Sequence, residues 1–158
     1  MSALLELRSV QKRYDNGTLA LERVDLAVGQ HEFLSLLGPS GCGKSTALKM
    51  IAGLSPVTSG SIAWADMTGD HAKDISFVFQ EPTLMPWTKV FENVWMPLRL
   101  KGVSRTAAKP QVDAVLDKVG LAQFANVYPR ELSGGMKMRV SIARAMVTQP
   151  RQIGRAHV

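Results

Sequence analysis

One glycine-rich run near the start of the chain has the residue types that phosphate binding needs. It fits the pattern G-x-x-x-x-G-K-[ST], in which backbone N–H groups surround a triphosphate, a lysine contacts its β- and γ-phosphates, and a hydroxyl reaches Mg²⁺. Its glycines allow the backbone to turn inward without a Cβ in the way. We predict that the whole run binds phosphate, with Lys44 as the fixed charge and Ser45 as a Mg²⁺ ligand. The run is Gly38-Pro39-Ser40-Gly41-Cys42-Gly43-Lys44-Ser45-Thr46.

The segments on either side of this loop agree with that prediction. Residues 33–37 are apolar and predict a buried strand, and residues 47–52 predict a helix. A helix that begins at the end of the loop adds its N-terminal dipole to the anion site. The alternative is a glycine-rich turn between a strand and a helix, which Lys44 and Ser45 argue against. The loop alone does not separate a kinase, a GTPase or a transport ATPase.

A second glycine pair follows a serine later in the chain. Ser133 can cap a helix, and Gly134 and Gly135 leave the amides of the first turn uncovered, which makes a second anion-binding helix start. A glycine-rich cap with no ligand explains the same residues equally well. The apolar positions that predict the helix are Val140, Ala143, Met146 and Val147.

Two further residues are candidates for a ligand site. Gln80 follows the compact apolar run 75–79, which predicts a buried parallel strand, and ligands of open α/β sheets meet the carboxyl ends of such strands. Gln80 is therefore a candidate site residue. Tyr14 precedes the turn at residues 15–17 and could stack on a nucleobase, although simple packing is favoured from the residues alone.

The remaining pattern predicts the elements that must position these residues. Proline at 110 lacks an N–H and disfavours helix at the residue before it, so we expect a new helix to begin there. Gly120 should end that helix. The expected elements are an antiparallel strand pair at 4–10 and 21–28, a short strand at 60–64, a polar loop at 66–74, and helices at 91–96 and 112–119.

Composition narrows the class of protein. The 158 residues are 46% apolar, which suits one globular core, and the net charge of +6 comes from scattered basic residues that predict a solvated face. We therefore expect no nucleic-acid partner. The chain has no apolar run long enough to span a bilayer and no leader pattern at its start, so a cytoplasmic location is expected. Its single cysteine, Cys42, excludes an internal disulfide.

The phosphate loop, Gln80 and the Leu132-Ser133-Gly134-Gly135 run resemble, in order and spacing, the ATP-binding subunits of ATP-binding cassette (ABC) transporters. The resemblance implies an α/β fold: a P-loop NTPase (ABC ATPase) core with an antiparallel β edge and an α-helical subdomain, incomplete at the C-terminus. The expected domains are a nucleotide-binding core at 1–86 and a helical subdomain at 87–150. Residues 151–158 are expected to be a non-native tail.

The resemblance also implies roles for the matching positions. Tyr14 resembles the aromatic residue that stacks on adenine, and Gln80 resembles the glutamine that contacts Mg²⁺ and the attacking water, a catalytic role shared with Lys44. Ser133, Gly134 and Gly135 resemble the signature that grips the γ-phosphate of ATP on a second, head-to-tail subunit. The implied cofactors are ATP and Mg²⁺. The implied partners are that second subunit, a transmembrane permease that holds the protein at the inner face of the cell membrane, and indirectly a solute-binding protein.

One substitution points to a narrower group within the family. Met136 stands where glutamine is commonest after the signature, a variant that resembles importers of nitrate, sulfonate, taurine and pyrimidine precursors. Residues 81–87 resemble the same group. The narrower expectation is a small anionic or nitrogen- or sulfur-containing cargo.

The chain departs from the family pattern after Pro150. There the family has a strand that ends in a Mg²⁺-binding Asp and a catalytic Glu, whereas the last acidic residue here is Glu131. We therefore expect no ATP hydrolysis from the 158 residues, and exposed apolar surface at 33–37 and 75–79. His157 is not assigned as the family's switch histidine, because no strand is expected before it. Residues 153–158 match one reading frame of a common sequencing adapter, which is why a non-native tail is expected.

Two alternatives to an importer ATPase remain. One is a non-hydrolysing ATP-binding or interaction module, which the missing carboxylate favours. The other is a soluble ABC protein of translation or DNA repair, which the single cassette and the importer-like residues 81–87 disfavour.

Overall fold

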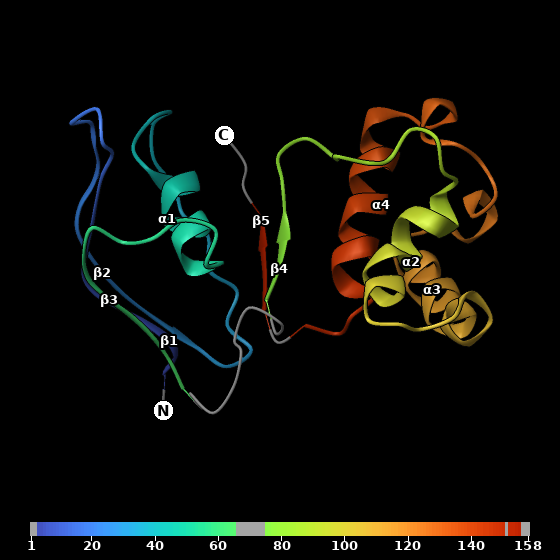
Figure 1. Ribbon diagram of the computed structural model, residues 1–158, viewed down its shortest axis with the longest axis horizontal. Helices are drawn as coiled ribbons and strands as arrows, with labels where there is room; N and C mark the ends of the chain where they lie inside the picture. The colour runs from blue at the N-terminus through green and yellow to red at the C-terminus, as the bar shows by residue number, and fades with distance from the viewer. Residues whose placement is uncertain (1–2, 66–74, 151, 156–158) are drawn as a thin grey trace. The chain divides into compact units, whose positions relative to one another are not determined.

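The computed structural model describes residues 3–65, 75–150 and 152–155. These form two compact units, one ending at Ala65 and the other beginning at Ile75, and each is considered separately. Figure 1 shows the elements of both. The predicted polar loop at 66–74 lies outside the described residues, as do residue 151 and residues 156–158.

The first unit is a three-stranded antiparallel sheet with one helix (Figure 1). The central strand pairs with both neighbours, through Leu7↔Leu26 on one side and Leu7↔Ile62 on the other. This confirms the predicted antiparallel pair and the predicted short strand. The elements are β1 (Ala3–Arg13), β2 (Leu19–Gly29), α1 (Lys44–Ile51) and β3 (Ser59–Trp64).

The core of the first unit lies between its sheet and α1. Buried side chains of the two come together there, because alternate residues of β1 and the apolar face of α1 both need cover from water. The core residues are Leu5, Leu7, Val10, Val28, Met50 and Ile51. This packing holds α1 against the sheet, and the glycine-rich loop ends where α1 begins.

The buried strand predicted at residues 33–37 is wrong, because residues 32–39 form neither helix nor strand. A strand needs a neighbour for its backbone N–H and C=O groups, and no described strand pairs with this segment. Phe33 is 94% exposed and Leu37 is 90% exposed. The expected apolar exposure of this segment is thus confirmed.

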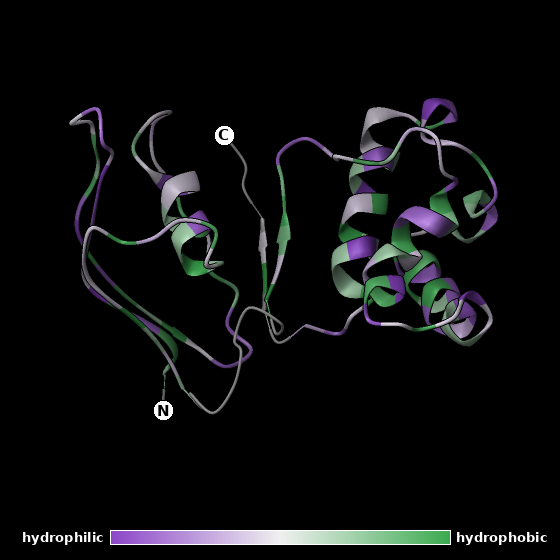
Figure 2. Cartoon of the chain, viewed as in Figure 1, coloured by the Kyte–Doolittle hydropathy of each residue, from purple (hydrophilic) through white to green (hydrophobic). Residues whose placement is uncertain are grey.

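The second unit contains two parallel strands and a group of packed helices. Figure 2 shows hydrophobic and hydrophilic residues alternating along each of these helices, as amphipathic packing requires. Within the group, α2 packs on α3 and α4, and α4 also packs on β4. The elements are β4 (Ile75–Val78), α2 (Val90–Leu100), α3 (Arg105–Lys118), α4 (Gly134–Met146) and β5 (Gln152–Arg155), with short 3₁₀ turns at Ala122–Phe124 and Pro129–Glu131.

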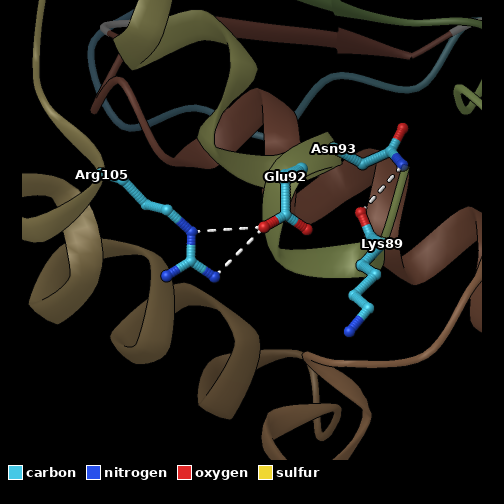
Figure 3. Close-up of polar contacts among 4 residues, drawn as sticks. All are labelled: Lys89, Glu92, Asn93 and Arg105. Atoms are coloured by element: carbon cyan, nitrogen blue, oxygen red, sulfur yellow. Dashed lines mark hydrogen bonds and ion pairs between the residues drawn. The ribbon is translucent and has the colours of Figure 1, made fainter.

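The second core is built mainly by α2, α3 and α4. It includes Val94, Leu116 and Val140, each fully buried. An ion pair ties α2 to the start of α3: the Arg105 guanidinium donates to Glu92 Oε1 at 3.1 and 3.3 Å, as Figure 3 shows. The guanidinium also lies 4.5 Å from the centre of the Phe91 ring.

The helix break predicted at Pro110 is wrong. α3 begins at Arg105 and continues through Pro110. Ser104 caps it by accepting from the Ala107 N–H at 3.3 Å, and Ala108 is buried in the core. Cap and burial together hold the first turns, and Pro110 is exposed, so its ring points into solvent. The helix does end where predicted, at Gly120, whose φ is 68°.

The expectation that no strand precedes His157 is also wrong. β5 pairs in parallel with β4 from Ile75↔Gln152 to Val78↔Arg155, which confirms that the segment at 75–79 is a parallel strand. A lone β4 would leave its backbone groups unpaired, and β5 supplies partners for one edge. His157 itself lies outside the described residues. The non-native origin of residues 151–158 stays a prediction.

No helix in the described ranges has the length and apolar character that crossing a bilayer would take.

Candidate functional site

The glycine-rich loop ends at a point where only glycine fits. Gly43 precedes α1 with φ 94°, and a Cβ built there would overlap the Ala20 carbonyl oxygen and the Leu21 side chain of β2. Gly41 has φ 83°, a left-handed conformation that glycine adopts without strain. The loop therefore turns sharply and lies directly against β2.

Lys44 folds back into the loop that it follows. Its ammonium donates to the carbonyl oxygens of Gly38 at 2.8 Å and Pro39 at 2.7 Å, and lies 3.4 Å from Cys42 Sγ. These contacts hold the positive charge within the turn. Since α1 also begins at Lys44, the charge coincides with the positive end of a helix dipole. The start of α1 is thus suited to an anion with several oxygens.

A cavity of about 290 Å³ opens beside Lys44. It is lined by three segments that are separated in sequence: the hairpin turn, the start of β2, and the loop with the first turn of α1. The lining residues are Tyr14, Thr18, Leu19, Ala20, Gly41, Gly43, Lys44, Ser45 and Thr46. Gly38, Pro39, Ser40 and Cys42 belong to the loop but are not part of this lining.

Tyr14 forms one wall of the cavity and is 41% exposed. Its hydroxyl lies 3.4 Å from Thr46 Oγ1, and the Lys12 ammonium lies 5.3 Å from its ring centre. Lys12 is itself buried and donates to the Pro56 carbonyl at 2.8 Å. The ring is thus oriented from two directions and partly open to solvent, which suits a planar apolar ligand group. Its role in stacking stays a prediction.

Sequence reasoning missed three lining residues: Thr18, Leu19 and Ala20. They come to the cavity because the hairpin closes at Tyr14, whose N–H donates to the Thr18 carbonyl at 2.9 Å. The sequence could have predicted these three residues, because the antiparallel strand pair and the turn between its strands were both predicted. Residues that face Tyr14 across that turn had to lie beside it.

Gln80 and Ser133 belong to the second unit. Gln80 is exposed and lies just beyond the end of β4, as predicted. Ser133 caps α4 by accepting from the Met136 N–H at 3.3 Å, which confirms the predicted helix start. A Cβ added at Gly134 or Gly135 would meet no atom within 4 Å.

The open space at Gly134 and Gly135 matters for their interpretation. Glycine in a helix costs roughly 1 kcal/mol relative to alanine, and no described part of this chain approaches closely enough to require it. The pair leaves the first-turn amides of α4 uncovered, so a ligand or a second chain can reach them.

The cavity has the groups that bind phosphate. Its lining contains a lysine, hydroxyls and backbone N–H groups but no carboxylate. Within 3–65, 75–150 and 152–155, no group of three His, Cys, Asp or Glu side chains could hold a metal ion by itself. A Mg²⁺ ion here would need phosphate oxygens among its ligands, beside the Ser45 hydroxyl.

Comparison with known proteins identifies the class. The family model described as ABC transporter matches residues 21–153. The chain therefore belongs to the ABC transporter family and has the α/β ABC ATPase fold, with an antiparallel β edge and a group of helices.

Individual relatives agree with this assignment. The chain is 42% identical over 153 residues to the spermidine/putrescine import ATP-binding protein PotA of Nitrosospira multiformis, covering 94% of this chain and 42% of that protein. It is 39% identical over 152 residues to the sn-glycerol-3-phosphate import ATP-binding protein UgpC of Cupriavidus metallidurans, covering 94% and 41%.

A solved structure shows the same fold. It is cbiO1 from Clostridium perfringens, part of the ABC transporter complex cbiONQ, with a TM-score of 0.87 and 25% identity. The match covers 98% of this chain and 65% of that one. By contrast, the chain spans less than half the length of the two curated relatives above, PotA and UgpC.

Proposed function

We propose that this chain is the nucleotide-binding part of the ATP-binding subunit of an ABC importer. The observation that carries the proposal is the cavity in which Tyr14 and Lys44 meet. An aromatic wall and a lysine-centred phosphate loop are the two features that a nucleoside triphosphate needs, one for its base and one for its phosphates.

In this proposal, ATP is held by residues of the first unit. The backbone N–H groups from Gly41 to Thr46 receive the phosphates, and Lys44 leaves its loop carbonyls to contact them. The Ser45 hydroxyl would be a Mg²⁺ ligand, and Gln80 would be a second one in the complete subunit. When bound, Mg²⁺ neutralises phosphate charge. Ser133, Gly134 and Gly135 bind the γ-phosphate held by a second copy, which explains two glycines that no other described residue requires by close contact.

The importer assignment rests on the relatives, which are named as import ATP-binding proteins. The implied partners are a transmembrane permease, a second ATP-binding subunit and, through the permease, a solute-binding protein. The subunit would then lie at the inner face of the cell membrane. For cargo, Met136 and residues 81–87 favour nitrate, sulfonate or taurine, whereas the two relatives above are named for polyamines and glycerol phosphate.

A non-hydrolysing ATP-binding module is the second candidate. It is favoured by one observation: the cavity lining has no carboxylate. ATP binding is common to both candidates, so it is the property to test first.

The test compares two lysines of the same helix. Lys44→Ala removes the charge from the phosphate loop, whereas Lys49→Ala removes an exposed charge of α1 that does not line the cavity. A hydrogen bond to a charged group is worth about 1.5–3 kcal/mol, so Lys44→Ala should weaken Mg-ATP binding by about tenfold or more. Titration with a fluorescent ATP analogue measures both variants.

The matched aromatic pair extends this test. Tyr14→Ala should weaken binding, and Tyr128→Ala, in the second unit, should not. Equal affinity of the parent chain and Lys44→Ala for Mg-ATP would contradict the assignment of the phosphate loop.

A further inference from the structure

Helix α4 carries an arginine whose hydrogen bonds all reach one short segment. Arg144 Nη1 donates to the Thr83 carbonyl at 3.0 Å, and Nη2 donates to the Pro82 carbonyl at 3.2 Å and to Thr83 Oγ1 at 3.0 Å. Three acceptors on two consecutive residues match the planar fork of a guanidinium, which a lysine could not reproduce.

The charge of Arg144 makes this contact unusual. The side chain is half-buried, and burial lowers the pKa of its guanidinium. No carboxylate of the described residues pairs with it, so neutral backbone and hydroxyl oxygens take the place of an acid. Burying a charge without an ionic partner is costly, and the cost is offset only if these hydrogen bonds are kept.

The segment that Arg144 holds has a strained backbone. Thr83 has φ 46°, in the left-handed region that β-branched residues rarely adopt. Such a conformation persists only where the surroundings fix it. All three hydrogen bonds of Arg144 end on Thr83 or on the residue before it, so they are the contacts that fix it.

The next part of the same connection is held separately. Asn93, fully buried in α2, accepts from the Met85 N–H at 2.8 Å and donates to the Thr88 hydroxyl at 2.9 Å and to the Lys89 carbonyl at 3.1 Å (Figure 3 shows the last of these). The connection from β4 to α2 is thus fixed near α2 by Asn93. Near Gln80, it is fixed by Arg144.

We propose that Arg144 is a positioning residue that fixes the segment after Gln80 to the helix that begins at Ser133. Gln80 and Ser133 are both site residues in the proposed ATPase. What the link through Arg144 does for the mechanism therefore rests on the proposed function. The body of α4 is rigid, since Val140 and Ala143 are buried in the helical core. A displacement of Ser133 at the start of α4 is therefore passed to Gln80 through Arg144.

The test measures the position of the segment directly, without nucleotide. Cys42, the only cysteine, is replaced by serine, and spin labels are attached at Glu81→Cys and Ala114→Cys, two exposed positions of the second unit. Dilution with unlabelled chain removes distances between copies. Electron–electron double resonance then gives the distribution of distances between the segment and the helical group.

Arg144→Gln should broaden this distribution relative to the parent chain. Arg144→Lys should broaden it less than Arg144→Gln does. Arg139→Gln is the matched control, because Arg139 lies on the same helix and also donates to a backbone carbonyl, that of Val119 at 3.1 Å. It should leave the distribution as in the parent. If Arg144→Gln does not fold, Thr83→Val, which removes one acceptor, decides the matter by the same broadening.

An unchanged distribution in Arg144→Gln overturns the proposal, and equal broadening in Arg139→Gln does so as well, because the effect would then belong to α4 as a whole. Mg-ATP affinity is measured on Arg144→Gln in the chain that keeps Cys42, and it should equal that of the parent, since the cavity is built by the first unit. A parent chain that binds no ATP would contradict the proposed function and leave the result for Arg144 standing.

Discussion

Single buried polar residues do much of the positioning in this chain. Asn93 in α2 and Lys12 in β1 are both buried, and each is hydrogen-bonded to the backbone of another segment: Lys12 donates to the Pro56 carbonyl, and Asn93 accepts from the Met85 N–H. A buried polar group costs stability unless it is hydrogen-bonded, so such a residue specifies one conformation of the segment that it contacts. Lys12 thereby fixes the surroundings of Tyr14, and Asn93 fixes the connection that precedes α2.

Asn93→Ala should lower the free energy of unfolding by about 1–3 kcal/mol, because it leaves the Met85 N–H without its acceptor and removes the side-chain donor to the Thr88 hydroxyl. Urea denaturation followed by far-ultraviolet circular dichroism measures the change. Asn126→Ala is the control, since Asn126 is exposed in the same unit and should change stability by no more than about 0.5 kcal/mol. Equal losses in the two variants would show that the hydrogen bonds of Asn93 add nothing.

At this scale, the sequence predicted the glycine turn before α1 and the Ser133 cap because their chemistry is local. Gly43 shows the limit of local reasoning. The backbone turn there was predicted to need glycine, but the close approach of Gly43 to Ala20 and Leu21 could be seen only in the structure. Asn93 and Arg144 were missed altogether. Nothing in the residues next to Asn93 shows that its amide will be buried, and nothing next to Arg144 shows that its guanidinium will meet backbone oxygens of a segment far away in the sequence.

The helices and strands depend on a balance between local propensity and tertiary packing. The antiparallel strands and α4 were predicted because alternation, turn residues and a capping serine agree with their packing. α3 shows the opposite case, since Ser104 and the burial of Ala108 prevail over the local effect of Pro110. The segment at 33–37 shows a third case, in which an apolar pattern predicts a strand and no described strand pairs with it.

Pro110→Ala should therefore stabilise the second unit. The substitution restores a backbone N–H inside α3, where proline costs up to about 3 kcal/mol, and the gain is reduced by about 1 kcal/mol because the unfolded chain becomes more flexible. Since Pro110 is exposed, no packing is lost. The urea midpoint should rise, and it should not rise for Pro86→Ala, an exposed proline outside any helix. A lower midpoint for Pro110→Ala would indicate that the proline is needed where it is.

At the scale of the whole molecule, the site elements are divided between two units: the cavity lies in the first, and Gln80 and Ser133 lie in the second. Sequence order could predict which elements carry these residues. It could not predict how the elements group into units, because grouping depends on which strands find partners. β5 shows this, since its pairing with β4 joins segments more than seventy residues apart.

The 158-residue chain should bind Mg-ATP without hydrolysing it above background. Hydrolysis needs a carboxylate that orients the attacking water, and the cavity lining has none. Phosphate release, measured with a coupled assay, should be the same in the parent and in Lys44→Ala. Release that depends on Lys44 would contradict the prediction and make Glu81 the first carboxylate to replace.

The exposed apolar residues of the first unit should make the chain self-associate. The side chains of Phe33 and Leu37 are almost fully exposed, and the backbone of residues 32–39 belongs to no helix or strand. The apolar side chains and the backbone groups of this segment are therefore available to a second copy of the chain. Burying one such side chain is worth about 1.5–3 kcal/mol. The double variant Phe33→Ser/Leu37→Ser should therefore raise the concentration at which association begins by about tenfold or more, as measured by sedimentation velocity.

Leu100→Ser is the control, because Leu100 is 80% exposed at the end of α2, where the backbone is already paired within a helix. An equal effect of Leu100→Ser would attribute the association to general hydrophobicity, and a monomeric parent chain at high concentration would contradict the prediction outright.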